Sequence, residues 1–170
     1  MPKKIILLMM VLAFLFSSCQ SAKKDGFAIY LLTKNIPAAE LMGVDINQWE
    51  IESEPILSIS DIVSYAKSDH TLQLTQAAYS RVQNIFPTPV RVGGIPFVVC
   101  AGGERIYTGA FWTPLSSLSY DGVFIMQSFD PTGTTIQIAL EYPGSDFFAG
   151  NDPRDDPRIM QALERENKLK

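Results

Sequence analysis

The pattern of apolar and polar positions predicts three strands in the first half of the sequence. Residues 27–32 (FAIYLL) are apolar nearly throughout, which is typical of a buried strand. Residues 70–75 (HTLQLT) alternate between polar and apolar side chains, as a strand with one buried face does. Residues 48–53 (QWEIES) also alternate and predict a short strand. Between them, residues 60–65 (SDIVSY) predict a single helical turn, capped by its first two residues.

Two further pairs of strands are predicted in the second half. Apolar runs at 97–100 and 105–112 flank Gly102 and Gly103, and glycine readily adopts the positive φ angles that a tight hairpin turn requires. Residues 123–127 and 134–142 form the second pair, around the turn-forming sequence DPTG.

Two helices carry recognisable start signals, and together with the strands they predict the fold class. Thr75 is the predicted N-cap of a helix over residues 76–85, whose apolar residues recur at helical spacing. Asp156 is the predicted N-cap of a C-terminal helix, with Pro157 at its first position. We therefore expect a single α+β domain over 27–170, in which one or two helices and the C-terminal helix pack on a mainly antiparallel sheet.

Residues 1–18 have the pattern of a secretory signal peptide. A basic start with Lys3 and Lys4 precedes twelve consecutive apolar residues, 5–16, and two serines follow them. Twelve residues in a helix rise about 18 Å, which is short of the roughly 30 Å hydrocarbon core of a bilayer. We therefore expect this segment to be cleaved rather than to span a membrane permanently.

The sequence FSSC at residues 16–19 resembles the lipobox of bacterial envelope lipoproteins, with Phe16 where that family prefers leucine. The resemblance implies that the Cys19 thiol receives a diacylglycerol, that the chain is cut before it, and that residues 19–26 form a lipidated tether. Because Gln20 rather than aspartate follows, the family's sorting rule points to the outer membrane of a host with two membranes. A plain signal peptide with an incidental cysteine, or an uncleaved signal anchor, is the alternative interpretation.

Composition and charge narrow the classes of function. The chain has 170 residues, of which 46% are hydrophobic and 19% charged, as expected for a globular protein with a core. Its net charge is −4, and loss of Lys3 and Lys4 with the signal peptide makes it −4 − 2 = −6. An acidic protein is a poor match for nucleic acid, which requires cationic side chains against its phosphates. With one histidine and two cysteines, we expect no cofactor and no zinc site.

Cys100 and His70 are the candidates for thiol chemistry. A cysteine nucleophile requires a lowered pKa, supplied by a neighbouring base or cation. Cys100 ends an apolar run, where cysteine behaves as a small buried hydrophobe, and His70 follows Asp69 at the start of a predicted strand. We therefore expect no catalytic residue in this pair, and keep a small secreted thiol enzyme or hydrolase that uses Cys100 with His70 as the alternative.

The acidic segment near the C-terminus is a candidate calcium site. Its oxygen-bearing residues are Asp146, Asn151, Asp152, Asp155 and Asp156. Calcium binds six to eight oxygens, but their spacing does not follow the EF-hand loop. Two Asp-Pro pairs explain the acids as turn and cap residues, so we expect no metal here.

Aromatic residues gather in sequence around the predicted hairpin and its exit. They are Tyr107, Phe111, Trp112 and Tyr120. Most such rings belong to a core, but any that are exposed would form a platform for a peptide or ligand. We name these four as the candidate contacts for a partner.

Residues 74–85 (LTQAAYSRVQNI) and 95–111 (IPFVVCAGGERIYTGAF) are similar to one stretch of the extracytoplasmic region of the SecD protein-export subunit. The similarity covers roughly residues 55–112 and consists of a strand, a helix and a hairpin. It implies a related α+β module, in a family where that region handles emerging polypeptide. The membrane spans of SecD are absent here, so proton-driven transport is not implied.

These observations favour a non-catalytic, lipid-anchored envelope protein that binds a protein or peptide partner, with a relation to protein export. Its expected location is the extracytoplasmic side of the bacterial envelope, where Cys19 would hold it to the membrane.

Overall fold

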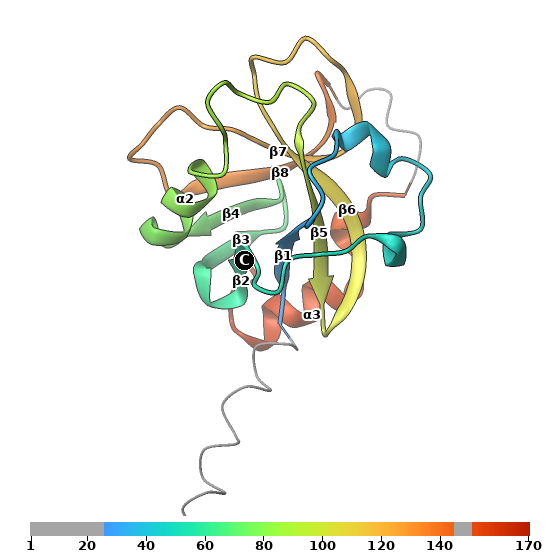
Figure 1. The fold of residues 1–170 in the computed structure, drawn as a ribbon. Coiled ribbons are helices and arrows are strands. Elements are labelled where there is room, and N and C mark those ends of the chain that lie inside the picture. Colours follow the sequence, from blue (N-terminus) through green and yellow to red (C-terminus); the bar gives the residue numbers. More distant parts are fainter. Residues whose placement is uncertain (1–25, 145–150) are drawn as a thin grey trace, which may run out of the picture.

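The computed structural model describes residues 26–144 and 151–170. Its eight strands form one sheet in the order β2-β1-β5-β6-β7-β8-β4-β3 (Figure 1). The strand bounds are β1 Ala28–Leu31, β2 Leu57–Ser58, β3 Ile62–Ala66, β4 Thr71–Leu74, β5 Ile95–Ala101, β6 Glu104–Trp112, β7 Tyr120–Met126 and β8 Thr135–Tyr142. The helices of the described residues are α2 Gln76–Gln83, α3 Pro157–Arg165, and the 3-10 helices η2 Ala38–Leu41, η3 Ile46–Gln48, η4 Ile59–Asp61 and η6 Pro153–Asp155.

The predicted α+β fold with a mainly antiparallel sheet is confirmed, although the sheet is mixed at one place. Six neighbouring strand pairs are antiparallel, and β6 and β7 run parallel, with Gly109 opposite Val123 and Trp112 opposite Met126. Residues 113–119 join these two strands and lead back along β6 instead of making a tight turn. This longer connection is what permits the parallel pairing.

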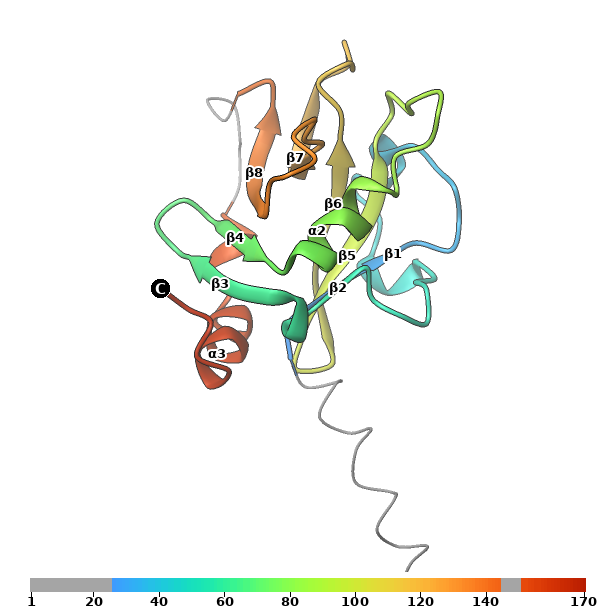
Figure 2. The same ribbon diagram turned by 90° about the vertical axis from the view of Figure 1, so that its left-hand side faces the viewer.

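The sheet curls so far that its two edge strands come together, and these strands are also neighbours along the chain. β2 is the first strand of the sheet order and β3 the last, yet only the three-residue helix η4 separates them in sequence. Figure 2 shows β2 and β3 next to one another at this seam. The curl encloses the largest cluster of buried side chains, with Phe97, Phe111 and Ile125 among its members.

Both α-helices cover this core through their apolar faces. α2 contributes Ala78, Tyr79 and Val82, and α3 contributes Ile159 and Leu163, all of them buried in the same cluster. Burying a leucine or isoleucine side chain stabilises the fold by about 1.5–3 kcal/mol. Helices as short as α2 and α3 are only marginally stable on their own, so this packing is what stabilises them.

Three local predictions are confirmed at the level of single hydrogen bonds. The Thr75 side chain accepts a hydrogen bond from the backbone N–H of Ala78 and begins α2. The Asp156 side chain accepts one from the N–H of Arg158 and begins α3, with proline at its first position. The β5–β6 hairpin turns at Gly102–Gly103, whose φ angles are 59° and 81°.

Two local predictions are wrong, for the same physical reason. The helical turn predicted over 60–65 ends at Asp61, because Ile62–Ala66 pairs with β4 as the strand β3. The strand predicted over 48–53 is reduced to one bridge between Ile51 and Leu32. In both places a pairing partner outside the predicted segment, β4 in the first and Leu32 in the second, decides the local structure.

Residues 1–18, Cys19 and most of the tether over 19–26 lie outside the described residues. Across the part of the chain that the structure describes, none of the helices is long and apolar enough to cross a membrane.

Candidate functional site

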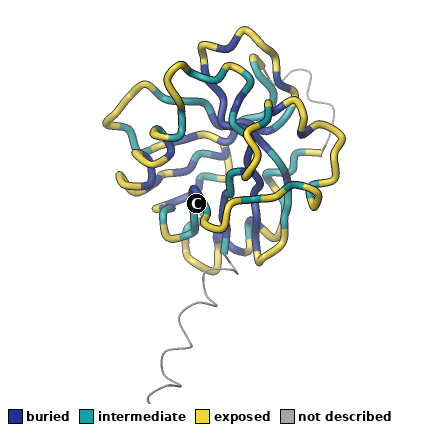
Figure 3. The backbone as a smooth tube through the Cα atoms, viewed as in Figure 1, coloured by how far each residue is buried: buried dark blue, intermediate teal, exposed yellow. Residues whose placement is uncertain are grey.

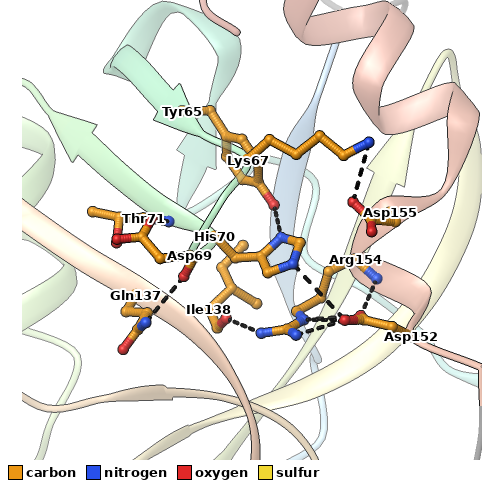
Figure 4. Close-up of polar contacts among 10 residues, drawn as sticks. All are labelled: Tyr65, Lys67, Asp69, His70, Thr71, Gln137, Ile138, Asp152, Arg154 and Asp155. Carbon is orange, nitrogen blue, oxygen red and sulfur yellow. Dashed lines mark hydrogen bonds and ion pairs between the residues drawn. The ribbon is translucent and has the colours of Figure 1, made fainter. Parts of the chain in front are cut away.

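A group of titratable side chains surrounds His70, in the turn between β3 and β4 (Figure 4). The hydroxyl oxygen of Tyr65 lies 2.7 Å from Nδ1 of His70, and Nε2 lies 3.8 Å from a carboxylate oxygen of Asp152. Arg154 donates from Nε to Asp152 at 2.8 Å and from Nη1 to the carbonyl oxygen of Ile138 at 2.8 Å. The cluster therefore joins the β3–β4 turn, β8 and η6.

Burial sets the protonation state of this cluster. His70 and Tyr65 are both buried. Burial, with the positive charge of Arg154, lowers the pKa of His70 below its ordinary value, although three carboxylates, chiefly Asp152, oppose the shift. The hydrogen bond from Arg154 lowers the pKa of Asp152, and burial raises that of Tyr65. A neutral His70 thus shares a hydrogen bond with the Tyr65 hydroxyl at Nδ1, while its Nε2 faces an ionised Asp152.

This arrangement resembles a nucleophile–histidine–carboxylate triad in connectivity but not in access. Tyr65 is 1% exposed, so its hydroxyl cannot reach a substrate in this fold. Its raised pKa also opposes formation of the phenolate that would act as the nucleophile. The cluster is suited to fastening the β3–β4 turn rather than to chemistry.

Because of this cluster, we expect the protein to be less stable in mildly acidic solution. Because the pKa of His70 is lowered in the folded state, the unfolded chain takes up a proton first as pH falls through the ordinary value of 6.5. The contribution of His70 to the free energy of unfolding is therefore complete above pH 6.5, and it is lost as the pH falls toward the lowered pKa of His70 in the folded state. Denaturant titration at pH 7.5 and pH 5.5 should give the smaller free energy of unfolding at the lower pH.

His70→Asn is the variant that isolates this effect. His70 has a φ of 55°, a conformation that asparagine tolerates well among non-glycine residues, and asparagine does not titrate. The variant should lose most of the difference between pH 7.5 and 5.5. An unchanged pH dependence would assign the effect to other groups.

Cys100 does not meet His70 in this fold. Cys100 packs with Leu32, Leu41 and Val98 in a separate cluster, and burial raises the pKa of its thiol. The prediction of a buried cysteine agrees with this placement. Its charged neighbour is Arg105, whereas the partners of His70 are Tyr65 and Asp152. The described contacts of the thiol are therefore those of a core residue and not of an activated nucleophile.

The four aromatic residues proposed as partner contacts lie in the core, and this prediction is wrong for the fold described. Tyr107, Phe111, Trp112 and Tyr120 are each less than 9% exposed. Tyr107 and Phe111 face the main cluster, whereas the rings of Trp112 and Tyr120 stack 5.1 Å apart on the other face of the sheet. Because β6 is covered on both faces, neither face presents these rings to solvent.

The described members of the acidic segment are occupied as caps and ion-pair partners. Asp152 and Asp156 cap η6 and α3 and bind Arg154 and Arg158, and Asp155 lies 3.6 Å from Nζ of Lys67. Asp146 lies outside the described residues, and Asn151 is exposed. Within 26–144 and 151–170, no group of three potential metal-ligating residues converges.

A candidate binding surface lies instead at one end of the sheet, where β5 begins and β6 ends. We call it the apolar loop end and define it as Val92, Leu115 and Leu118, which are 47%, 63% and 51% exposed. Figure 3 shows that exposed positions gather in the loops around the buried strands. The two loops that carry these residues are adjacent, and exposed apolar surface that is contiguous is typical of interaction sites.

Buried serine and threonine side chains hold this surface in place. The Ser116 hydroxyl donates to the carbonyl oxygen of Val92 at 2.7 Å and accepts from the N–H of Leu118 at 3.2 Å. The hydroxyl of Thr113, which is fully buried, accepts from the N–H of Leu115 at 3.3 Å. The three apolar side chains are thus carried on two loops that are bonded to each other.

Sequence reasoning missed the apolar loop end because its residues come from two segments more than 20 positions apart. The available signal was isolated apolar residues inside the proline-rich and serine-rich segments PTPVRVGG and TPLSSLS.

Comparison of the chain with protein-family models, with curated proteins and with solved structures finds no match.

Proposed function

We propose that this protein is a lipid-anchored extracytoplasmic module that binds a protein or peptide partner of the bacterial envelope through its apolar loop end. The observation that carries the proposal is the exposure of Val92, Leu115 and Leu118 on bonded loops. The resemblance of residues 55–112 to SecD favours an exported polypeptide as the partner.

The position of the predicted anchor relative to the apolar loop end supports this role. β1 begins at Ala28, opposite Cys100 near the end of β5, whereas the apolar loop end adjoins Ile95 at the start of β5. Seven residues of strand separate these two ends by about 20 Å. An anchor at Cys19 would therefore hold the apolar loop end away from the membrane. The net negative charge also favours separation from anionic lipid headgroups.

The anchor is tested by the intact mass of the protein extracted from membranes. We expect a mass that corresponds to a chain starting at Cys19 with a diacylglycerol attached, and loss of that modification in Cys19→Ser. A soluble, unmodified chain would contradict the anchored location and leave the binding proposal to be tested alone.

The binding surface is tested with a photoreactive amino acid at position 115, in cells that export the full chain. We expect a discrete crosslinked product that decreases at least tenfold when Leu118→Asp is added, because a buried contact would then contain a charge. Position 44 is the matched control, since Val44 is 37% exposed and precedes η3, whose Ile46 carbonyl oxygen accepts a hydrogen bond from Arg105 at the opposite end of β6. The same products from both positions would contradict the proposed surface.

A further inference from the structure

Phe129 is a large aromatic side chain that the fold leaves 63% exposed. It lies between β7 and β8 and belongs to none of the buried apolar clusters found within 26–144 and 151–170. Its neighbours in the sequence QSFDPTG are polar or turn-forming. Packing therefore does not require a phenyl ring at this position, and exposing one to water is unfavourable.

The backbone on both sides of Phe129 is nevertheless fixed by hydrogen bonds. The Ser128 hydroxyl accepts from the N–H of Asp130 at 3.1 Å. The Asp130 carboxylate accepts from the N–H of Thr132 at 2.9 Å and from its hydroxyl at 2.7 Å. The buried Tyr79 of α2 donates its hydroxyl to the carbonyl oxygen of Asp130 at 2.8 Å. The ring is thus presented on a preorganised turn, which reduces the entropy that binding costs.

Phe129 stands at the same end of the sheet as the apolar loop end. Because β6 and β7 are parallel, the loops that follow them start side by side, and the N–H of Gln127 donates to the carbonyl oxygen of Trp112 at 2.7 Å. Leu115 follows β6 by three residues, and Phe129 follows β7 by three. β5 also begins here, and Figure 1 shows the loops before β5 and after β6 and β7 in the upper part of the view.

These three loops offer a partner almost no charge to pair with. Their sequences, PTPVRVGG, TPLSSLS and QSFDPTGT, contain two charged residues, one of each sign. Arg91 donates to the carbonyl oxygen of Ile36 at 3.1 Å, and the Asp130 carboxylate bonds to Thr132. A charged partner group would lose water here without gaining a counter-ion, whereas an apolar group gains by burial.

The position of the predicted anchor favours one occupant of this surface. With Cys19 in the membrane, this end of the sheet points away from the bilayer that holds the protein. Two copies joined through it would direct their anchors in opposite directions, which disfavours pairing within one membrane. A separate polypeptide beyond the membrane surface meets neither obstacle.

We infer that Phe129 is an aromatic anchor of the partner site, and that the partner contributes an uncharged, apolar segment of polypeptide. The inference rests on the proposed function and names the chemistry of its partner. The Phe129 ring packs against an apolar side chain of that segment, beside the contacts made by the apolar loop end. Aromatic anchors on rigid supports contribute a large share of the binding energy at interfaces.

Four substitutions at position 129 test the anchor in the purified full chain. The probe is a fluorescent peptide with blocked ends, Gly-Leu-Ala-Phe-Ala-Leu-Gly, and its affinity is measured by anisotropy. We expect Phe129→Leu to bind within about twofold of the natural chain and Phe129→Ser at least fivefold more weakly. Phe129→Lys and Phe129→Glu should each weaken binding at least tenfold, because either charge would face an apolar segment.

Two controls accompany these variants. Val44→Ser should leave the affinity unchanged, since Val44 is exposed but precedes η3 near the other end of β6. Because the Phe129 side chain lies outside the core clusters, the midpoint of urea unfolding should be the same in all four variants. Opposite effects of Phe129→Lys and Phe129→Glu would overturn the uncharged partner.

The charge of the probe tests the partner chemistry from the other side. Peptides in which both leucines are replaced by glutamate or by lysine should bind at least fivefold more weakly. The affinity of the uncharged peptide should change by less than twofold between about 0.05 M and 0.5 M salt, since no ion pair is screened. Tighter binding of either charged peptide, or no binding of the uncharged one, would overturn the inference.

Crosslinking from position 115 in cells separates this inference from the proposed function. If its product persists unchanged in Phe129→Ser, the apolar loop end stands and the role of Phe129 is overturned. A product that contains only a second copy of this chain, or only lipid, would overturn the polypeptide segment as the occupant. Absence of any product at position 115 would contradict the proposed function itself.

Discussion

Replacing Phe111 by alanine is expected to lower the free energy of unfolding by about 4 kcal/mol. Phe111 is 0% exposed in the centre of the curled sheet. Its ring centroid lies 5.0 Å from that of Phe97 and 6.4 Å from that of Phe86, so its removal leaves a cavity with apolar walls on β5 and beyond α2. Equilibrium unfolding in urea, followed by circular dichroism, measures the loss.

Val63→Ala is the matched control for this prediction. Val63 also belongs to a strand but is 48% exposed, so we expect its substitution to change stability by less than about 0.5 kcal/mol. A Phe111→Ala variant as stable as the control would show that the ring is not a core residue. The result also matters for binding assays, because loss of a partner in this variant would reflect unfolding rather than a lost contact.

Arg154→Ala is the second substitution with a large expected effect, of about 2–3 kcal/mol. The Arg154 side chain is 14% exposed and donates to both Asp152 and the carbonyl oxygen of Ile138. Its removal leaves the Asp152 carboxylate without its cation and the β8 carbonyl without this donor. The release of η6 from β8 should also speed hydrogen exchange in the β3–β4 turn, where His70 lies.

Arg158→Ala provides a control with nearly the same local chemistry. Arg158 follows its N-cap Asp156 by two residues, as Arg154 follows Asp152, and each arginine bonds to the carboxylate before it. The Arg158 side chain is 47% exposed, however, and its second partner is the exposed Glu104. Water replaces such contacts well, so the loss should be much smaller than for Arg154. Equal losses would mean that burial does not distinguish the two pairs.

Local signals in the sequence predicted the parts of the fold that depend on neighbouring residues. Thr75 and Asp156 cap their helices through side-chain bonds to residues two or three positions away. Gly102 and Gly103 supply the positive φ angles of the turn between β5, which ends at Ala101, and β6, which begins at Glu104. In each case the stabilising contact lies within a few residues, so the amino-acid pattern contains it.

Strand pairing and long-range contacts decided the features that were mispredicted or missed. Ile62–Ala66 is a strand because β4 lies beside it, although its first residues also fit a helical turn. His70 meets Asp152, 82 positions away, because β8 and η6 bring the acidic segment against the β3–β4 turn. The sequence contains both residues but not their distance.

The sequence by itself determined the fold class, the starts of α2 and α3, the hairpin turn and the burial of Cys100, because these follow from periodicity and short-range bonding. Only the tertiary structure decided the parallel β6–β7 pair, the curl that places both sheet edges together, and the burial of the four aromatic rings. An aromatic residue in a strand is buried or exposed according to what covers each face of the sheet. That covering comes from segments distant in the chain, as where Ala38 of η2 packs with Trp112 and Tyr120.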